Sequence, residues 1–188
     1  MYKRQDINSS VAGQQQSEHE RLFALFAAAD ERQLALNPIA GLFRGDMRRA
    51  DRLGDFLTDA HTIATRTSTL LNLSELSKID RSQLNTTDQL AYDVFEYDQQ
   101  TGLKVTSDEI RALTEVRPVN HFSGFHTFYP TFASGKGAAP FKTIEDYENN
   151  LSRHQDYIDI GERAIARFRE GMETVSYTHL TLPTIYSV

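Results

Sequence analysis

Residues 143–171, which read TIEDYENNLSRHQDYIDIGERAIARFREG, form the longest regular apolar pattern in this 188-residue sequence. The apolar side chains follow the three-to-four-residue spacing of one face of an α-helix: Ile144, Tyr147, Leu151, Ile158, Ile165 and Phe168. Thr143 is a typical helix-capping residue, and the acidic residues just after it interact favourably with the helix dipole. The stretch therefore predicts a long helix that ends near Gly171. His154 lies on its apolar stripe and is interpreted as a core or boundary histidine.

Similar signals occur earlier in the chain. The segment Ser17–Glu20 has the spacing of a capping box and precedes apolar residues at helical spacing, which predicts a helix that ends at Asn37-Pro38. A second helix is expected from about Thr58 to Leu73. Its inward side chains are expected to be Ile63, Leu70 and Leu71.

Two further capping boxes start at Thr86 and Thr106. The first predicts a helix with one apolar stripe made of Leu90, Ala91, Val94 and Phe95. The second precedes a short helix that the Arg117-Pro118 pair stops. Because the sequence has no sustained alternation of apolar and polar residues, we predict an all-α fold.

Composition excludes several classes of function. The 26 acidic residues outnumber the 20 Lys and Arg, and a formal charge of −6 disfavours nucleic acid as a partner. The absence of Cys excludes a disulfide scaffold, a thiolate nucleophile and a Cys-ligated zinc site. The longest apolar run, residues 22–29, is far shorter than the roughly 20 residues of a membrane span.

The two ends of the chain resemble one DNA sequence read on opposite strands. The codons GTG TAT AAG AGA CAG encode residues 1–5 if GTG initiates, and their reverse complement in a shifted frame encodes Val-Ser-Tyr-Thr, as at residues 175–178. This inverted pair is similar to the transposon end of sequencing adapters, and adapter-derived residues carry no information about the natural fold. We therefore interpret residues 1–5 and 175–188 as adapter-derived, 6–16 as a flexible lead-in and 17–174 as a partial helical domain. The alternative for 175–188 is a short β-prone tail.

The most unusual passage runs from Val119 to Phe141 and is predicted to be a long aromatic loop. Its residues 119–132 are the part expected nearest to substrate, with these side chains facing it: His121, Phe122, Phe125, His126, Phe128 and Tyr129. The alternative is a loop that its own rings pin over the core. A zinc site at the two histidines is disfavoured, because their five-residue offset does not match the i, i+4 pair of one helix face.

The charged passage Gly41–Asp59 has two interpretations. Its dense, opposed charges are typical of a solvated network of ion pairs, and the sharper alternative is an anion site built on its arginines. No phosphate-loop spacing of glycines supports that alternative. A serine nucleophile has no support either, because the sequence has no Gly-x-Ser-x-Gly motif.

Several blocks in order are similar to the N-terminal part of a bacterial family, domain of unknown function 885 (DUF885). They are Asn37-Pro38, Gly45-Asp46, Asp51–Asp55, Ile79-Asp80 with Leu84, Asp88–Asp93, the loop around Gly124 and His126, Thr143–Glu148 and Arg169–Met172. The resemblance covers most of residues 20–173. It implies a mostly helical parent of several hundred residues that is similar to zinc metallopeptidases of the helical-cleft type, and many relatives are exported.

The resemblance also implies where the chemistry lies. The family's metal signature, H-E-x-x-P-G-H followed by E-G-W, does not occur in this sequence, so no residue here inherits a catalytic or metal-binding role. The zinc ligands are then expected downstream of Thr174. Zinc and a peptide substrate are expected to bind the parent protein. We expect an N-terminal lobe that is inactive alone and holds no cofactor. The alternative is a stand-alone helical binding module that uses the aromatic loop 119–132.

Overall fold

The computed structural model describes residues 16–120 and 122–173. Within these residues it contains helices and no strand, which confirms the all-α prediction. The interpretations of residues 1–5 and 175–188, and that of residues 6–16 apart from Gln16, lie outside the described residues. So does the expectation for His121.

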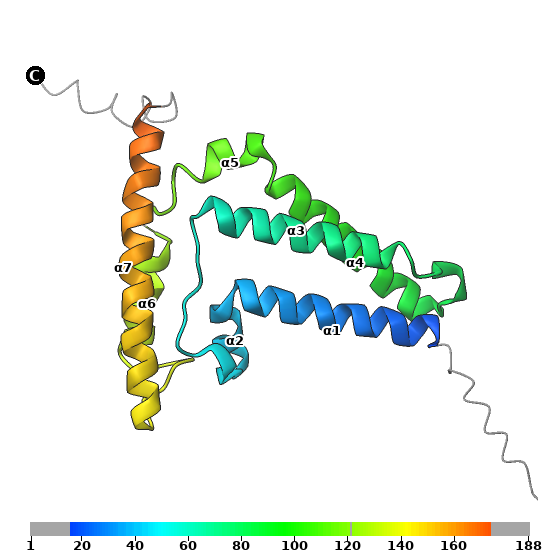
Figure 1. Ribbon diagram of the computed structural model, residues 1–188, viewed down its shortest axis with the longest axis horizontal. Coiled ribbons are helices and arrows are strands. Elements are labelled where there is room, and N and C mark those ends of the chain that lie inside the picture. The colour runs from blue at the N-terminus through cyan, green and yellow to red at the C-terminus, as the bar shows by residue number, and fades with distance from the viewer. Residues whose placement is uncertain (1–15, 121, 174–188) are drawn as a thin grey trace, which may run out of the picture.

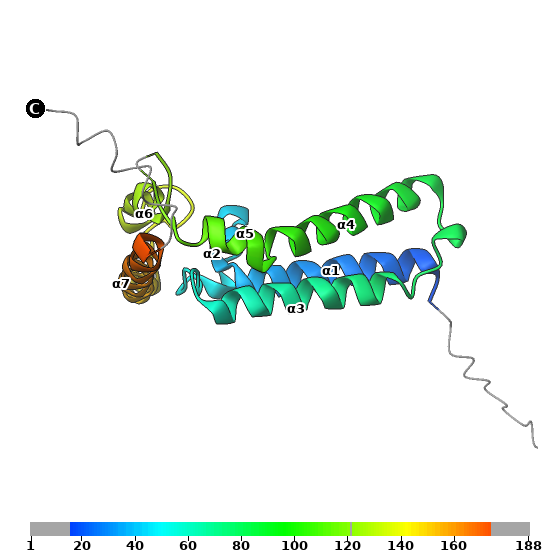
Figure 2. The same ribbon diagram turned by 90° about the horizontal axis from the view of Figure 1, so that it is seen from above.

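Three long helices form a bundle: α1 (Glu18–Leu36) and α3 (Asp59–Leu76) lie side by side, and α4 (Thr86–Val105) packs on one face of the pair. The longest helix, α7 (Ile144–Glu173), stands across one end of this bundle, with α6 (Phe125–Ala133) beside it (Figures 1 and 2). Short elements complete the chain: α2 (Pro38–Arg44), α5 (Asp108–Thr114) and the 3-10 helices η1 (Met47–Arg49) and η2 (Arg81–Gln83).

Local sequence explains where most helices begin. The Ser17 hydroxyl accepts a hydrogen bond from the Glu20 amide and the Glu20 carboxylate accepts one from the Ser17 amide, which confirms the capping box of α1. Thr58 caps α3, and the Thr143 hydroxyl accepts from the Asp146 amide at the start of α7. Pro38 both ends α1 and begins α2, because its fixed φ suits the first position of a helix.

The cap predicted at Thr86 is wrong by one residue. Asn85 is the N-cap of α4, and its side-chain oxygen accepts a hydrogen bond from the Asp88 amide at 3.0 Å. Asn is at least as good a cap as Thr, since its side chain reaches the same free amide. Ser107 is the N-cap of α5, one residue after the predicted Thr106, and it makes no side-chain bond to the helix amides.

Three apolar clusters form the core. The first joins α1 to the end of α3 and to η2 and is made of Leu22, Leu25, Leu76, Ile79 and Leu84. The second joins α2 to α6 through Leu42 and Phe132, and the third holds α7 through Leu53, Tyr129 and Ile160.

Most of the apolar side chains predicted to share a face on α3 and on α4 lie outside the core. On α3, Ile63 is 62% exposed and Leu70 is 49% exposed, and Leu71 is exposed as well, so the prediction that they point inward is wrong. Leu90 and Val94 of α4 are also exposed. Periodicity shows which residues share a helix face, but which face is covered depends on the neighbouring helices.

Candidate functional site

The aromatic passage is a helix over much of its length. The expectation of a continuous loop from Val119 to Phe141 is wrong for α6, which spans Phe125–Ala133 and carries its aromatic residues at helical spacing. The helix follows Gly124, whose φ of 143° lies in the region that favours glycine. A Cβ atom there would come within 2.6 Å of the Val119 side chain, so only glycine fits.

The rings of α6 pack on two neighbours: Phe125 and Tyr129 contact α7, and Phe132 contacts α2. The Tyr129 ring stacks on Tyr157 with centroids 3.8 Å apart and an interplanar angle of 7°, and it meets His154 edge-on. Phe125 meets the Tyr157 ring edge-on, with ring centroids 5.5 Å apart. These contacts match the alternative in which the passage is pinned by its own rings.

The predicted substrate-facing residues differ in how far their side chains are exposed. Tyr129 is buried, Phe125 is half-buried, and His126 and Phe128 are exposed. Phe122 is 82% exposed, ahead of α6. The exposed members can reach a ligand as they stand, whereas Tyr129 serves packing; contact of this set with substrate remains a prediction.

A connecting segment without helix or strand runs along α7, and local sequence patterns did not predict this contact. Residues 50–59, which link η1 to α3, rise beside α7 in the same direction (Figure 1). Polar side chains of α7 contact this segment in register: Arg153 with the Ala50 carbonyl, Asp156 with the Leu53 amide at 2.8 Å, Arg163 with Asp55 at 2.7 Å, and Arg167 with the Leu57 carbonyl at 3.2 Å. The charged passage therefore positions a helix and is more than a solvated network.

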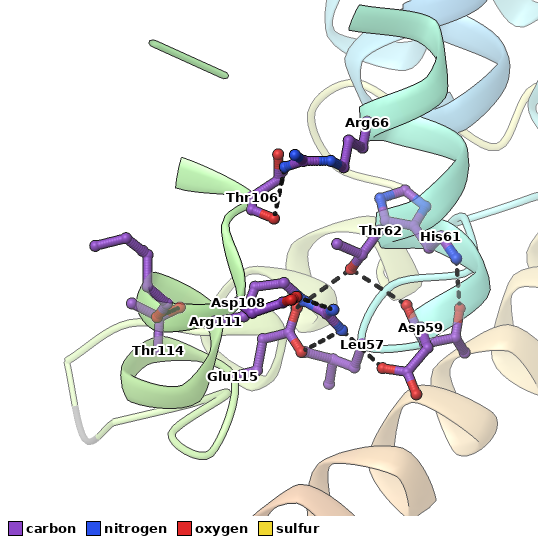
Figure 3. A network of polar contacts seen from close by, with 12 residues as sticks. Leu57, Asp59, His61, Thr62, Arg66, Thr106, Asp108, Arg111, Thr114 and Glu115 are labelled. Atoms are coloured by element: carbon purple, nitrogen blue, oxygen red, sulfur yellow. Dashed lines mark hydrogen bonds and ion pairs between the residues drawn. The ribbon is translucent and has the colours of Figure 1, made fainter. Parts of the chain in front are cut away.

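A network of ion pairs lies at the C-terminal end of this segment, around Asp59 (Figure 3). Asp59 accepts hydrogen bonds from Arg167 at 2.8 Å and from Arg111 at 2.7 Å, and Arg111 also binds Glu115. The bonds from Arg167 and Arg111 hold the pKa of the Asp59 carboxyl below its usual range. The bond to Glu115 raises the pKa of Arg111. Three helices, α3, α5 and α7, are thereby joined at one point.

Two buried polar atoms lie below this network without a partner in the described part of the chain. Nε of Arg153 and the hydroxyl of Tyr129 make no hydrogen bond there, although Arg153 is only 2% exposed. Burial lowers the pKa of Arg153 and raises the pKa of Tyr129. The guanidinium contacts neutral oxygens, of Ala50 and Asn150, so its role is to hold helix and segment together.

A cavity of about 790 Å³ lies among α1, α3 and α4. Its lining from α3 is polar and includes Thr65, Thr69 and Asn72. The buried Asn72 accepts from Arg32 at 2.6 Å and donates to Gln99 at 2.8 Å, so its amide is already satisfied. Phe26 and Phe95 supply the apolar part of the lining, and their ring centroids are 4.9 Å apart.

The described residues hold no group of side chains suited to bind a metal ion. Between residues 16 and 173, His121 aside, no three His, Asp or Glu side chains converge as ligands for a metal ion. The helices of that same region are also too short or too polar for any of them to cross a bilayer. Zinc in the parent stays a prediction, since it concerns residues outside this chain.

Comparison with known proteins gives one match. Residues 38–181 match the family model described as "Bacterial protein of unknown function (DUF885)". Neither the curated proteins nor the solved structures contain a match to this chain. The match includes α2 to α7 and the segment at residues 50–59 that α7 holds.

Proposed function

Because the chain belongs to the DUF885 family, we propose that it is the helical N-terminal lobe of a zinc-dependent peptidase. In this proposal the parent hydrolyses peptide bonds with residues that lie outside the described chain, and this lobe forms one wall of the substrate cleft. The lobe itself binds no zinc and has no hydrolase activity. The peptidase activity follows from the resemblance of the family to helical-cleft zinc metallopeptidases.

The observation that carries the lobe assignment is the open apolar face of α7. Ile144, Leu151 and Ile158 are 79%, 68% and 53% exposed, and Ile165 and Met172 continue the same row. A contiguous apolar surface of this kind marks a face that contacts another polypeptide or a ligand. A lobe that packs against the rest of a larger protein needs such a face.

The chemistry assigned to the parent is metal-assisted hydrolysis. A bound zinc ion would polarise the scissile carbonyl and activate water for attack. The residues of this chain would restrict access and contact the peptide. The exposed aromatic side chains Phe122 and Phe128, together with His126, support that role, because they offer apolar contact and one polar group on the same stretch.

The test begins with the gene. Sequencing outward from primers within the codons for residues 20–170 establishes whether the reading frame continues past Thr174 into a His-Glu metal motif. The parent is then expressed and assayed on a peptide library with zinc, after chelation and after zinc is restored. We expect cleavage that chelation abolishes and zinc restores, and no cleavage by the 188-residue chain.

Two results would contradict the proposal. The first is a parent that binds no zinc or cleaves no peptide. The second is a natural gene that encodes residues 1–5 as they stand and stops after Val188, which would favour a stand-alone binding module.

A further inference from the structure

Helix α7 carries two separate rows of side chains, each with a seven-residue repeat. The inner row packs on the protein and consists of Asn150, Arg153, Tyr157, Ile160, Ala164, Arg167 and Gly171. The outer row, here called the outer seam, consists of Ile144, Tyr147, Leu151, His154, Ile158, Gly161, Ile165, Phe168 and Met172. The Ile, Leu and Met residues of the outer seam are exposed, whereas its Tyr147 and His154 contact the rings of Phe141 and Tyr129.

The outer seam repeats with the spacing of a coiled-coil interface. Its residues alternate by three and four along the whole helix, and every first position of the repeat is Ile, Leu or Met. These first-position side chains are all at least half exposed, from 53% at Ile158 and Ile165 to 79% at Ile144. Such a seam fits the side chains of another α-helix better than it fits a small ligand or an extended strand.

Charge beside the outer seam narrows the choice of partner. Glu148 and Glu162 lie on its open flank, and neither of them forms an ion pair within residues 16–120 and 122–173. Arg169 is the one basic residue on that flank. A helix with Lys or Arg beside its own apolar seam would complement most of this edge.

Contact with a second copy of the chain would leave part of the exposed apolar surface uncovered. The three-helix bundle exposes another apolar row on α4, where Leu90, Val94 and Tyr97 are 64%, 59% and 73% exposed. Helix α4 belongs to the bundle, and α7 stands across the end of that bundle (Figure 2). A two-fold contact buries one patch on each copy, whereas a continuing polypeptide can cover both rows.

We infer that the outer seam of α7 is the docking face for an α-helix of the parent polypeptide outside residues 16–173. That helix has a heptad row of apolar side chains and a basic flank opposite Glu148 and Glu162. This inference rests on the proposed function, because it needs a parent that is longer than the described chain.

Cysteine accessibility tests the inference, since the chain has no native Cys. Ile165→Cys places a thiol in the outer seam, and Ala166→Cys places one on the next residue, which is exposed and off the seam. Each variant is made in the 188-residue chain and in the parent, whose own cysteines are replaced, and is labelled with a maleimide. In the parent we expect labelling at 165 to slow by about tenfold or more while labelling at 166 changes little. Leu151→Cys with Ser152→Cys as its control repeats the measurement on an earlier turn.

The outcomes separate this inference from the proposed function. Equal labelling of seam and control positions in the parent overturns the docking face, whatever the peptidase assay gives. Protection at 165 in a parent without zinc-dependent cleavage supports the docking face and contradicts the peptidase. Protection that appears in the 188-residue chain and grows with its concentration identifies a second copy as the occupant, and overturns the inference.

Discussion

Two isoleucines on α7, two residues apart, should differ sharply in what they contribute to stability. Ile160 is 2% exposed and packs with Leu53 and Tyr129, whereas Ile158 is 53% exposed on the outer seam. Ile160→Ala removes buried methyl groups and leaves a cavity, which typically costs about 2–5 kcal/mol. Full burial of an isoleucine is worth about 1.5–3 kcal/mol, so the half-hydrated Ile158 can lose only about 1 kcal/mol.

The helix propensity of alanine reduces the cost of Ile158→Ala further, because alanine is favoured over isoleucine by up to about 0.7 kcal/mol in a helix. Urea unfolding of the 188-residue chain, followed by circular dichroism, measures both variants. With a slope of about 1–3 kcal/mol per molar urea, we expect the midpoint to fall by roughly 1 M or more for Ile160→Ala and by a small fraction of that for Ile158→Ala.

The comparison can refute the orientation of α7. If Ile158→Ala costs as much as Ile160→Ala, the outer seam is buried in solution and the assignment of the two rows is wrong. Measurement at two protein concentrations separates an intramolecular contact from self-association, because only the latter makes the midpoint depend on concentration.

Three further predictions concern α7 and its neighbours. Asp156→Ala leaves the buried Leu53 amide without an acceptor and should cost about 1–3 kcal/mol in urea unfolding, whereas Asp156→Asn keeps an acceptor oxygen and should cost clearly less. The lowered pKa of Asp59 means that its ion pairs stabilise the fold above the ordinary carboxyl pKa of about 4 and less as the pH falls. Asp59→Asn should therefore lower the melting temperature at neutral pH, and this difference should vanish in acid; a constant difference would contradict the pairing. Tyr129→Phe removes a buried hydroxyl without a described partner and should leave the melting temperature unchanged or raise it, and a marked fall would show that the hydroxyl is bonded.

The local signals in the sequence predicted the beginnings of helices well. The capping box at Ser17, the caps at Thr58 and Thr143 and the proline after α1 all act through residues within one turn, so tertiary contacts are not needed to interpret them. The helix inside the aromatic passage was not predicted, because its local signals indicate a loop. Glycines flank α6 and Pro130 lies inside it, and both residue types usually indicate a loop.

The candidate site was harder to predict, because its contacts join distant parts of the chain. Arg167 contacts Asp59 and the Leu57 carbonyl across more than a hundred residues, and Arg153 does the same with Ala50. Nothing in the local pattern of either segment indicates which arginine meets which backbone group. The pairing depends on the parallel course of α7 and residues 50–59.

The sequence by itself determined that the chain is helical, where most of its helices start and which residues share each helix face, because caps and periodicity are local properties. Only the tertiary structure decided which face is covered. On α7 the inner row contains Arg153 and Arg167, which donate hydrogen bonds to the carbonyls of Ala50 and Leu57, whereas the Ile, Leu and Met side chains of the more apolar outer seam stay exposed. Hydrophobic burial has no direction of its own, so these directional polar contacts choose the side on which α7 packs.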